Sequence, residues 1–569
     1  MTADPESPAT DHPQCDFRIH RCILLFLPVR HIHISAWLLV LLSAVLQIVI
    51  FPLPGVYVLS WVALAPLLIA LLRTRKPSAL QLDENIKLLP ATPGQAFVLA
   101  YVCGIVWYAG TCYWIYATMH QYGGLSRPVA LLILFLFCLY LGLYHGVFGL
   151  VLSLAAGGRA FSRRALLVAP FLWVAVELAR TRITGLPWDL LGIAQVDNIP
   201  LARVATVTGV YGLSFEIMLV NTALAAAFLL RRDKCKILLG AGLAAALVLQ
   251  AGRWISPPRL PSTHAALLVQ ENIPILQGAD WTKDYFEGTL RDLTWISLNP
   301  PDSRASASSD SASPKSRHFD LIVWPESPAP FYTGDPGFRD VVSNVARQTN
   351  AWVITGSLGV RNASSSPQRE TEVYNSAALI SPSGEWVGRY DKVHLVPFGE
   401  YVPFRRAMPF MDMLTKEVGD FQRGSSRMPL DAGGARIGLI ICYESIFPDE
   451  VRQFVANGAQ VLVNISNDGW YGDSGAYAQH LNQTRMRAIE NDRWLLSATN
   501  TGVTASIDPY GRIVARAERK VRSALQAAYE LTSVTTFYTR HGDWFAYLCA
   551  IISIGALLTR FTSHRKTER

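Results

Sequence analysis

The stretch PVALLILFLFCLYLGLYHGVFGLVLSLAA, residues 128–156, contains no Asp, Glu, Lys or Arg. A helix that crosses the ~30 Å hydrocarbon core of a bilayer needs about 20 predominantly apolar residues. This stretch exceeds that length, so we expect a membrane-spanning helix that is long enough to tilt. It therefore indicates a protein built around a membrane bundle.

Seven further apolar segments meet or approach the same requirement. They are residues 35–53, 56–72, 97–119, 164–180, 205–230, 236–253 and 543–559. A long stretch of ordinary soluble composition separates the last two, so we predict an α-helical bundle of eight spans with one large polar insert. The expected divisions are a tail (1–34), a seven-span bundle (35–255), a polar domain (262–535), an eighth span (543–559) and a second tail (560–569).

The overall composition agrees with a membrane protein. Hydrophobic residues make up 51% of the chain and charged residues 17%, with a mean hydropathy of +0.24, whereas soluble proteins carry roughly 25% charged residues. An aromatic content of 11% and glycines without a three-residue period exclude disorder and a collagen-like fold. The net charge of +8 does not indicate nucleic-acid binding, because the basic residues lie mostly beside apolar segments.

The basic residues alternate between the loops of the predicted bundle. They concentrate in both tails and in the second, fourth and sixth loops, at Arg18, Arg21, Arg30, Arg73, Arg75, Lys76, Lys87, Arg159, Arg163, Arg164, Arg231, Arg232, Lys234, Lys236, Arg560, Arg565, Lys566 and Arg569. Positively charged loops stay in the cytoplasm, so both tails are expected inside and the polar domain outside. The apolar run Cys22–Val29 is short and lacks a cleavage site, so residues 1–34 are interpreted as a cytoplasmic tail.

The polar domain alternates β-rich apolar runs with helical stretches. The runs are His264–Val269, Leu321–Trp324, Trp352–Gly356, Ala377–Ile380, Ile437–Ile441, Val461–Ile465, Trp494–Ala498 and Thr504–Ile507; the helical stretches are Phe338–Gln348, Pro448–Asn457 and Gln479–Asp492. This alternation predicts a layered α/β domain. Two Ser-rich segments, Pro301–Arg317 and Asn362–Glu370, are interpreted as surface loops.

Cys442 is the single cysteine of the polar domain. Taken alone, a thiol without a disulfide partner would be interpreted as a small buried hydrophobe. However, Cys442 follows the apolar run Ile437–Ile441 and precedes a stretch expected to be helical from Phe447. The free N–H groups and the dipole at a helix N-terminus stabilise a thiolate. This setting favours a nucleophile.

Two more predicted strand ends carry ionisable side chains. Glu326 follows an apolar run and Pro325, at the carboxyl end of a strand, where open α/β sheets place ligands. Lys392 follows a strand among apolar residues, so its ammonium is expected to be semi-buried and to need a partner. Glu400 lies in the Pro- and Gly-constrained loop that follows. Alone, each could be a loop carboxylate or part of a surface salt bridge.

Together these residues suit acyl transfer through a thioester. Glu326 can accept the proton of the Cys442 thiol. Lys392, with a backbone N–H near Cys442, can stabilise the oxyanion of a tetrahedral intermediate. The polar domain contains no Cys/His cluster at metal-ligand spacing, so no metal is predicted.

The motifs around these residues resemble those of the nitrilase (carbon–nitrogen hydrolase) superfamily. The motifs are WPES (324–327), DKVHLVPFGEYVP (391–403), ICYES (441–445), NISNDGWYG (464–472) and RMRAIENDRWLLSATNTG (485–502). With seven predicted spans before this domain and one after it, nearly the whole chain is most similar to the apolipoprotein N-acyltransferases. By this resemblance Glu326 is the general base, Lys392 the stabilising cation and Cys442 the nucleophile.

The resemblance implies an αββα sandwich on a membrane bundle, with no cofactor. It implies a two-step reaction, in which the thiolate takes an acyl chain from a membrane phospholipid and passes it to an amine. The acceptor is the α-amino group of the diacylglyceryl-cysteine that begins an apolipoprotein. The implied location is the bacterial inner membrane with the catalytic domain in the periplasm, and the protein is expected to act as a monomer.

Five further positions match family motifs that support the site: Glu400, Tyr443, Glu444, Trp470 and Tyr471. The family usually has Phe where this chain has Tyr471, which puts the fine shape of the acyl pocket in question. The segment Phe404–Leu414 (FRRAMPFMDML) is suited to dip into lipid headgroups, or is an ordinary packed loop.

Several ionisable residues lie within or beside the predicted spans. Glu216 and His145 fall inside spans, where such groups are costly and often functional, although a structural hydrogen bond in the bundle is favoured. Glu177, Arg180, Arg182 and Trp188 lie near the outer end of the fifth span. They either line a lipid entry or anchor the interface.

Two other classes of function remain open. A membrane-tethered nitrilase-type amidohydrolase would use the same three residues with water as the acceptor, although small amides do not require seven preceding spans. A transporter or scaffold with a catalytically dead outward domain is opposed by the intact set of Glu326, Lys392 and Cys442.

Overall fold

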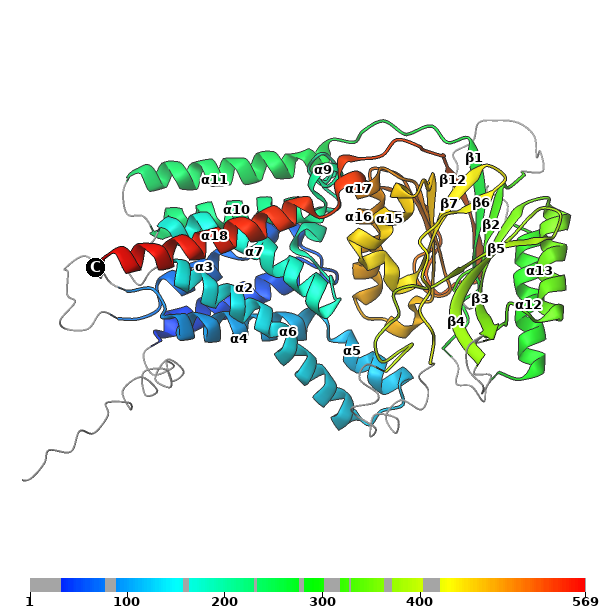
Figure 1. Ribbon diagram of the computed structural model, residues 1–569, viewed down its shortest axis with the longest axis horizontal. Helices are drawn as coiled ribbons and strands as arrows, with labels where there is room; N and C mark the ends of the chain where they lie inside the picture. The colour runs from blue at the N-terminus through cyan, green and yellow to red at the C-terminus, as the bar shows by residue number, and fades with distance from the viewer. Residues whose placement is uncertain are drawn as a thin grey trace, which may run out of the picture.

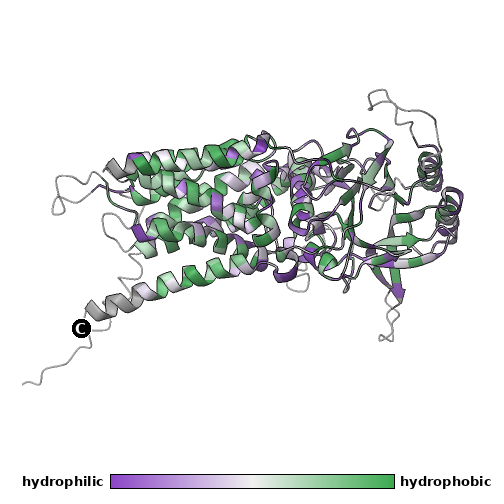
Figure 2. Ribbon diagram, turned by 90° about the horizontal axis from the view of Figure 1, so that it is seen from above, coloured by the Kyte–Doolittle hydropathy of each residue, from purple (hydrophilic) through white to green (hydrophobic). Residues whose placement is uncertain are grey.

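The computed structural model describes residues 32–76, 88–156, 163–229, 233–275, 281–300, 318–326, 329–362, 371–402 and 420–567. A helical bundle and a two-sheet domain lie end to end along the long axis (Figure 1). Apolar residues dominate the bundle helices, whereas hydrophilic residues concentrate in the two-sheet domain (Figure 2). The predicted tail up to residue 31 and the segments 301–317, 363–370 and 404–414 lie outside the described residues.

The long helices of the bundle coincide with the predicted spans. They are α2 (Ile34–Val49), α3 (Ala65–Leu72), α4 (Pro93–Thr111), α6 (Arg127–Ala156), α7 (Arg163–Ala179), α10 (Val210–Leu229), α11 (Asp233–Ala251) and α18 (Trp544–Thr567). Among the described residues, four segments are long and apolar enough to cross a membrane, namely 93–111, 127–156, 210–229 and 236–254. The other helices do not combine this length with this hydropathy, so the number of eight spans stays a prediction. Helix α18 runs on to Thr567, so the division expected at residue 559 falls inside a helix.

Three predicted spans are not single helices. Residues 56–72 form the short η3 (Tyr57–Trp61), which is followed by α3. In the segment 97–119, α4 ends at Thr111 and is followed by α5 (Trp114–Ala117) and η5 (Thr118–Tyr122). Residues 205–230 are split into α9 (Ala205–Thr208) and α10 by Gly209. Gly209 has φ +67°, a left-handed conformation that favours glycine, and a Cβ there would lie 2.6 Å from the Tyr538 ring. The expectation of unbroken helices over these three segments is wrong.

Short elements connect the bundle helices and join the bundle to the two-sheet domain. They are η6 (Arg180–Thr184), η7 (Leu191–Gln195), α8 (Ile199–Ala202), η8 (Gly252–Trp254) and α17 (Phe537–His541). Arg182, just past α7, pairs with Asp543 at 2.6 Å and with Asp449 of the two-sheet domain at 3.1 Å. The Trp188 indole N–H donates to Gln479 Oε1 at 2.8 Å. Arg182 and Trp188 therefore join the bundle to the two-sheet domain.

The polar domain contains two six-stranded sheets, ordered β12-β1-β2-β3-β4-β5 and β11-β10-β9-β8-β7-β6. The first contains β1 (His264–Gln270), β2 (Leu321–Val323), β3 (Trp352–Asn362), β4 (Thr371–Ile380), β5 (Trp386–Asp391) and β12 (Ser523–Tyr529). The second contains β6 (Leu430–Ala432), β7 (Ala435–Ile441), β8 (Val461–Ser466), β9 (Leu495–Thr499), β10 (Ala505–Ile507) and β11 (Ile513–Arg516). In each sheet three neighbouring strands are parallel, β1-β2-β3 and β7-β8-β9. The predicted α/β class is confirmed.

The two sheets bury their apolar faces against each other. Leu268 and Val323 of the first sheet belong to the same buried cluster as Leu439, Val463 and Leu496 of the second. Helices α12 (Lys283–Leu298) and α13 (Pro336–Thr349) cover the other face of the first sheet. Helices α15 (Pro448–Ala456) and α16 (Ala476–Asn491) lie between the second sheet and the bundle (Figure 1). The edge of the domain that faces the bundle is therefore built from α15 and α16.

Candidate active site

Three strand ends bring the predicted residues together. Strand β3 is parallel to β2, and β5 runs in the same direction as β3, because two antiparallel pairings separate them. Strands β2 and β5 therefore end at the same edge of the first sheet, where Glu326 and Lys392 follow them. In the second sheet β7 ends immediately before Cys442.

The Lys392 ammonium lies between two buried carboxylates. Lys392 Nζ is 3.3 Å from Glu326 Oε1 and 2.9 Å from Glu400 Oε1. Only 1% of Lys392 is exposed, against 7% of Glu326 and 9% of Glu400. The expectation of a semi-buried lysine was therefore too cautious, and the surface salt bridge considered for Glu400 is in fact a buried ion pair.

Backbone and amide donors complete the partners of both carboxylates. The Asn375 amide donates to Glu326 Oε1 at 2.8 Å and to Glu400 Oε1 at 2.6 Å. The Asn467 backbone N–H donates to Glu326 Oε2 at 2.9 Å, and the Val396 N–H donates to Glu400 Oε2 at 2.7 Å. All four carboxylate oxygens accept a hydrogen bond, so the cluster is fixed in one geometry.

The two carboxylates determine the protonation state of Lys392. Burial by itself lowers the pKa of the ammonium, but the charges of Glu326 and Glu400 outweigh burial and raise this pKa above its ordinary value. Lys392 is therefore a permanent cation at neutral pH. A fixed positive charge in a buried site can stabilise an oxyanion without reorganisation.

Cys442 lies where a strand turns sharply into a short 3-10 turn, η12 (Cys442–Ile446), which we call the nucleophile turn. Its φ is +52°, a left-handed conformation that few non-glycine residues adopt and that often marks a functional position. Burial raises the pKa of the Cys442 thiol well above its ordinary value, and the Glu326 carboxylate raises it further, while Lys392 lowers it. The resting thiol therefore keeps its proton, and its activation needs a base.

The helix predicted from Phe447 begins where expected, but it is separated from Cys442 by the nucleophile turn. Helix α15 starts at Pro448, after the nucleophile turn, and Pro448 occupies a first-turn position that Pro favours. The thiol is therefore not at a helix N-terminus, and stabilisation of a thiolate by that helix dipole is excluded.

Glu444 holds the nucleophile turn to the loop that carries Lys392. Its Oε1 accepts from the Val393 N–H at 2.7 Å and from the Tyr390 hydroxyl at 2.7 Å, and its Oε2 accepts from the Ile441 N–H at 2.9 Å. Tyr443 is 7% exposed, and its hydroxyl donates to the carbonyl of Gly185, in the loop after α7. Glu444 therefore joins the two sheets, and Tyr443 joins the site to the bundle.

Trp470 and Tyr471 are adjacent in sequence but lie in different surroundings. Trp470 is 44% exposed and packs on Tyr122, away from the charged cluster. Tyr471 is 8% exposed, and its ring contacts Trp114 and Trp188 of the bundle. Burial raises the pKa of Tyr471 well above its ordinary value. Tyr471 therefore lies at the boundary with the bundle, beside the His480 ring.

Three residues of the site were not identified from the sequence. Asn375 lies within β4 and bridges the two carboxylates. Asn467 contributes a backbone N–H, and His480 of α16 lies under Cys442. A polar Asn inside the apolar end of β4 was the one indication available, because a buried polar side chain needs partners.

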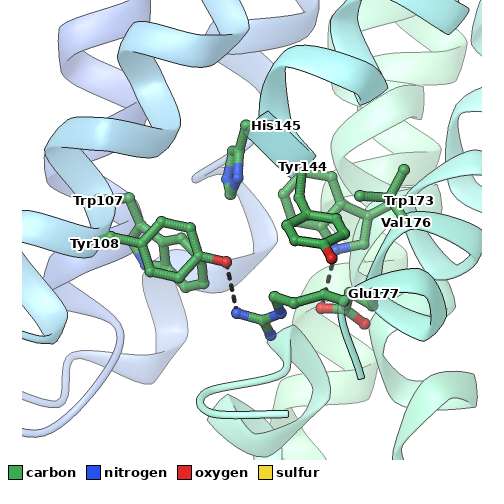
Figure 3. Close-up of a pocket in the computed structure, with 8 residues that line it drawn as sticks. Trp107, Tyr108, Tyr144, His145, Trp173, Val176 and Glu177 are labelled. Atoms are coloured by element: carbon green, nitrogen blue, oxygen red, sulfur yellow. Dashed lines mark hydrogen bonds between the residues drawn. The ribbon is translucent and has the colours of Figure 1, made fainter. Parts of the chain in front are cut away.

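The ionisable residues of the bundle form a separate cluster. Arg180 donates to the Tyr108 hydroxyl at 2.7 Å, and His145 and Glu177 lie beside it on the wall of a small pocket (Figure 3). Glu177 Oε1 accepts from the Leu191 N–H at 2.8 Å. Glu216 lies on α10, and its Oε2 has no hydrogen-bond partner among the described residues. In the described residues no group of three or more His, Cys, Asp or Glu side chains is arranged to hold a metal ion.

Comparison with known proteins matches both parts of the chain. The carbon–nitrogen hydrolase family model matches residues 277–538, which contain Glu326, Lys392 and Cys442. The crystal structure of the Helicobacter pylori G27 carbon–nitrogen hydrolase aligns with a TM-score of 0.33 and 16% identity, covering 47% of this chain and 88% of that one. The family model thus covers nearly all of the two-sheet domain.

Matches to the rest of the chain identify the family within this class. The model of the apolipoprotein N-acyltransferase N-terminal domain matches residues 43–223. The apolipoprotein N-acyltransferase of Geobacter metallireducens is 36% identical over 541 residues, 93% of this chain and 96% of that protein. The Methylococcus capsulatus protein of the same name is 34% identical over 474 residues, 81% and 87% of the two chains. The chain belongs to the apolipoprotein N-acyltransferase family.

Proposed function

We propose that this protein transfers an acyl chain from a membrane phospholipid, through a thioester on Cys442, to the α-amino group of the diacylglyceryl-cysteine of an apolipoprotein. The observation that carries the proposal is the buried cluster of Glu326, Lys392 and Glu400 acting on a protonated thiol beside an apolar bundle. Family membership supports the choice of donor and acceptor.

In the first step Glu326 accepts the Cys442 proton while the sulfur attacks the ester carbonyl of the phospholipid. The carbonyl oxygen becomes an oxyanion, which the Lys392 ammonium stabilises. When the intermediate collapses, the ester C–O bond breaks and Glu326 returns its proton to the leaving alkoxide. A thioester and a lysophospholipid result.

In the second step the neutral amine attacks the thioester carbonyl. Lys392 stabilises the second oxyanion, the C–S bond breaks, and the amine proton passes through Glu326 to the departing sulfur. This restores the thiol and leaves an amide on the acceptor. The same residues therefore act in opposite directions in the two steps.

A membrane-tethered amidohydrolase would use the same cluster with water as the second acceptor. Two observations favour acyl transfer. Buried aromatic side chains line the boundary between the site and the bundle, where Tyr471 packs on Trp114 and Trp188. The match of residues 43–223 to the acyltransferase N-terminal domain is not expected of a soluble amidase.

The catalytic domain is proposed to face the periplasm, in a monomer embedded in the inner membrane. Arg73 and Arg163 lie at the ends of α3 and α7, in loops expected to stay cytoplasmic. A cysteine engineered at Trp295 should react with an impermeant thiol reagent on spheroplasts, whereas one at Arg163 should not. The reverse pattern would overturn the orientation.

The decisive experiment is mass spectrometry of the purified protein after incubation with phospholipid alone. We expect an acyl adduct on the peptide that contains Cys442, no adduct in Cys442→Ala, and loss of the adduct when a diacylglyceryl peptide is added. Absence of any adduct on Cys442 in protein that acylates the peptide would refute the thioester.

A further inference from the structure

A buried histidine lies directly beneath the nucleophile turn. His480 is 2% exposed and lies in the second turn of α16. Its Nδ1 is 3.1 Å from Asp468 Oδ1, and its Nε2 is 3.1 Å from the Cys442 carbonyl oxygen and 2.9 Å from Ser445 Oγ. Both ring nitrogens therefore have oxygen partners.

On each side of the ring, one partner can only accept a hydrogen bond. The Asp468 carboxylate and the Cys442 carbonyl have no proton to give, and a neutral imidazole carries a single N–H. In either neutral tautomer, one nitrogen lone pair would face an oxygen lone pair at 3.1 Å. The Ser445 hydroxyl could donate to Nε2, but the Cys442 carbonyl would then still face a lone pair. Only the doubly protonated ring satisfies both contacts.

We infer that His480 is a buried imidazolium that positions Cys442 for acyl transfer, by donating to the Cys442 carbonyl from one nitrogen and to Asp468 from the other. The cation would sit under the attacking sulfur without contacting the substrate. It would act as a positioning residue, because it fixes the carbonyl of a residue held at φ +52°.

The groups packed around the ring support this protonation state. Asp468 lies on η13 (Asp468–Tyr471), Trp188 of the bundle stacks on the ring with an interplanar angle of 3°, and Tyr471 lies beside it. Burial lowers the pKa of His480, but Asp468, the Cys442 carbonyl and the more distant Glu326 outweigh burial and raise it above the ordinary value. Any stabilisation from the hydrogen bonds of protonated His480 to Asp468 and to the Cys442 carbonyl is therefore present at low and neutral pH. It is lost as the pH rises through the raised pKa of His480.

The residue before His480 connects the same helix to the bundle. Gln479 donates to the Pro52 carbonyl at 2.7 Å and to the Thr111 carbonyl at 3.2 Å, and it accepts from Trp188. Adjacent residues of α16 thus bind the bundle and the nucleophile turn. These contacts fix the position of the Cys442 thiol relative to the helical bundle. This role rests on the proposed function, whereas the protonation state does not.

The protonation state is tested on the full-length protein in nanodiscs, with ¹⁵N-labelled histidine and carbonyl-¹³C-labelled cysteine. The ring of His480 is identified in the wild-type protein by dipolar coupling of its nitrogen to the Cys442 carbonyl carbon. We expect both nitrogens to be protonated, with a titration midpoint above 6.5. A midpoint at or below 6.5, or a ring protonated on one nitrogen at neutral pH, would overturn the inference even if acyl transfer is confirmed.

The positioning role is tested by single-turnover formation of the acyl-enzyme. We expect His480→Asn to slow this step by roughly 10–100-fold, the effect of a small misplacement of a reacting group, with an unchanged KM for phospholipid. His264→Asn is the matched control, because His264 also contacts a carboxylate, Asp320, but lies in β1 away from the site. The wild-type rate should fall above the midpoint found by NMR, and this fall should be absent in His480→Asn. A wild-type rate in His480→Asn, or the same fall in that variant, would refute the role.

Discussion

The catalytic cluster and the cluster around Arg180 in the bundle are both buried and charged, but they differ in how well their polar atoms are satisfied. In the catalytic cluster every oxygen of Glu326 and Glu400 accepts a hydrogen bond. In the bundle cluster Arg180 donates to Tyr108, whereas both oxygens of the fully buried Asp189 have no partner among the described residues.

The comparison separates two uses of buried charge. A buried ion pair is weak evidence for stability, because desolvation offsets much of its attraction. The complete hydrogen bonding of Glu326 and Glu400 instead fixes the position and charge of Lys392 at the place where an oxyanion would form. The cluster around Arg180 lacks this completeness, so its side chains are not held in one arrangement to the same degree. We therefore expect substitutions in the two clusters to have different consequences.

The largest effect is expected from Cys442→Ala, which removes the sulfur and leaves the catalytic charges intact. Acyl transfer should be abolished, while the melting temperature should stay close to that of the wild type, because Cys→Ala removes a single heavy atom. Activity is measured with a diacylglyceryl peptide and unfolding by differential scanning calorimetry. Cys442→Ser serves as the control for shape and should also be nearly inactive, since a hydroxyl is much harder to deprotonate. Full acyl-transfer activity in either variant would show that the Cys442 sulfur is not the nucleophile.

Glu326→Gln should come next, because it keeps the shape of the side chain but removes the base. Acyl-enzyme formation should slow by about 10²–10⁴-fold, the usual contribution of a positioned base. Starting from pre-acylated enzyme, transfer to the acceptor should recover partly at higher pH, where the amine is already neutral. Rapid-quench mass spectrometry measures both steps. Equal rates of acylation in wild type and Glu326→Gln would reject the assignment of the base.

Lys392→Ala should slow both steps, by roughly 10²–10³-fold each, because each step passes through an oxyanion. It should also lower the free energy of unfolding by about 3–5 kcal/mol, since two buried carboxylates lose their counter-ion. Lys392→Arg keeps the charge and separates electrostatics from geometry. If pre-acylated Lys392→Ala transferred its acyl chain at the wild-type rate, the ammonium would have no role in the second step.

The smallest effect is expected from Asp189→Asn in the bundle. Both Asp189 oxygens lack hydrogen-bond partners among the described residues, so removing the carboxylate breaks no hydrogen bond there and should change the free energy of unfolding by less than about 1 kcal/mol. Glu400→Gln is the matched change in the catalytic cluster and should be clearly destabilising, because Glu400 pairs with Lys392 at 2.9 Å. Equal changes in melting temperature for Asp189→Asn and Glu400→Gln would contradict the proposed difference between the two clusters.

The three strand ends of the site were predictable from the sequence. Glu326 and Cys442 each follow an apolar run that stops abruptly at a charged or reactive residue, and such runs are recognisable without tertiary contacts. The start of α15 was also readable, because Pro448 is typical of a first helical turn. The helix was expected from Phe447, next to its observed start, but the effect of its dipole was wrongly extended to Cys442, which lies before the nucleophile turn.

The remainder of the site depends on register and on contacts between layers. Asn375 reaches Glu326 because β4 pairs with β3 and β5 in a particular register, and His480 reaches Cys442 because α16 packs under the nucleophile turn. Strand β5 (WVGRYD) was not delimited in advance, since its charged residues hide the alternation. Local patterns do not encode such long-range pairings.

Chasing an isolated acyl-enzyme with acceptor tests the thioester mechanism most directly. The wild-type protein is acylated with labelled phospholipid, separated from free lipid, and mixed with a diacylglyceryl peptide alone. We expect one equivalent of acylated peptide for each equivalent of thioester lost from Cys442, with little free fatty acid. Release of the label as fatty acid, or an adduct that stays on Cys442 until fresh phospholipid is added, would contradict transfer through this cysteine.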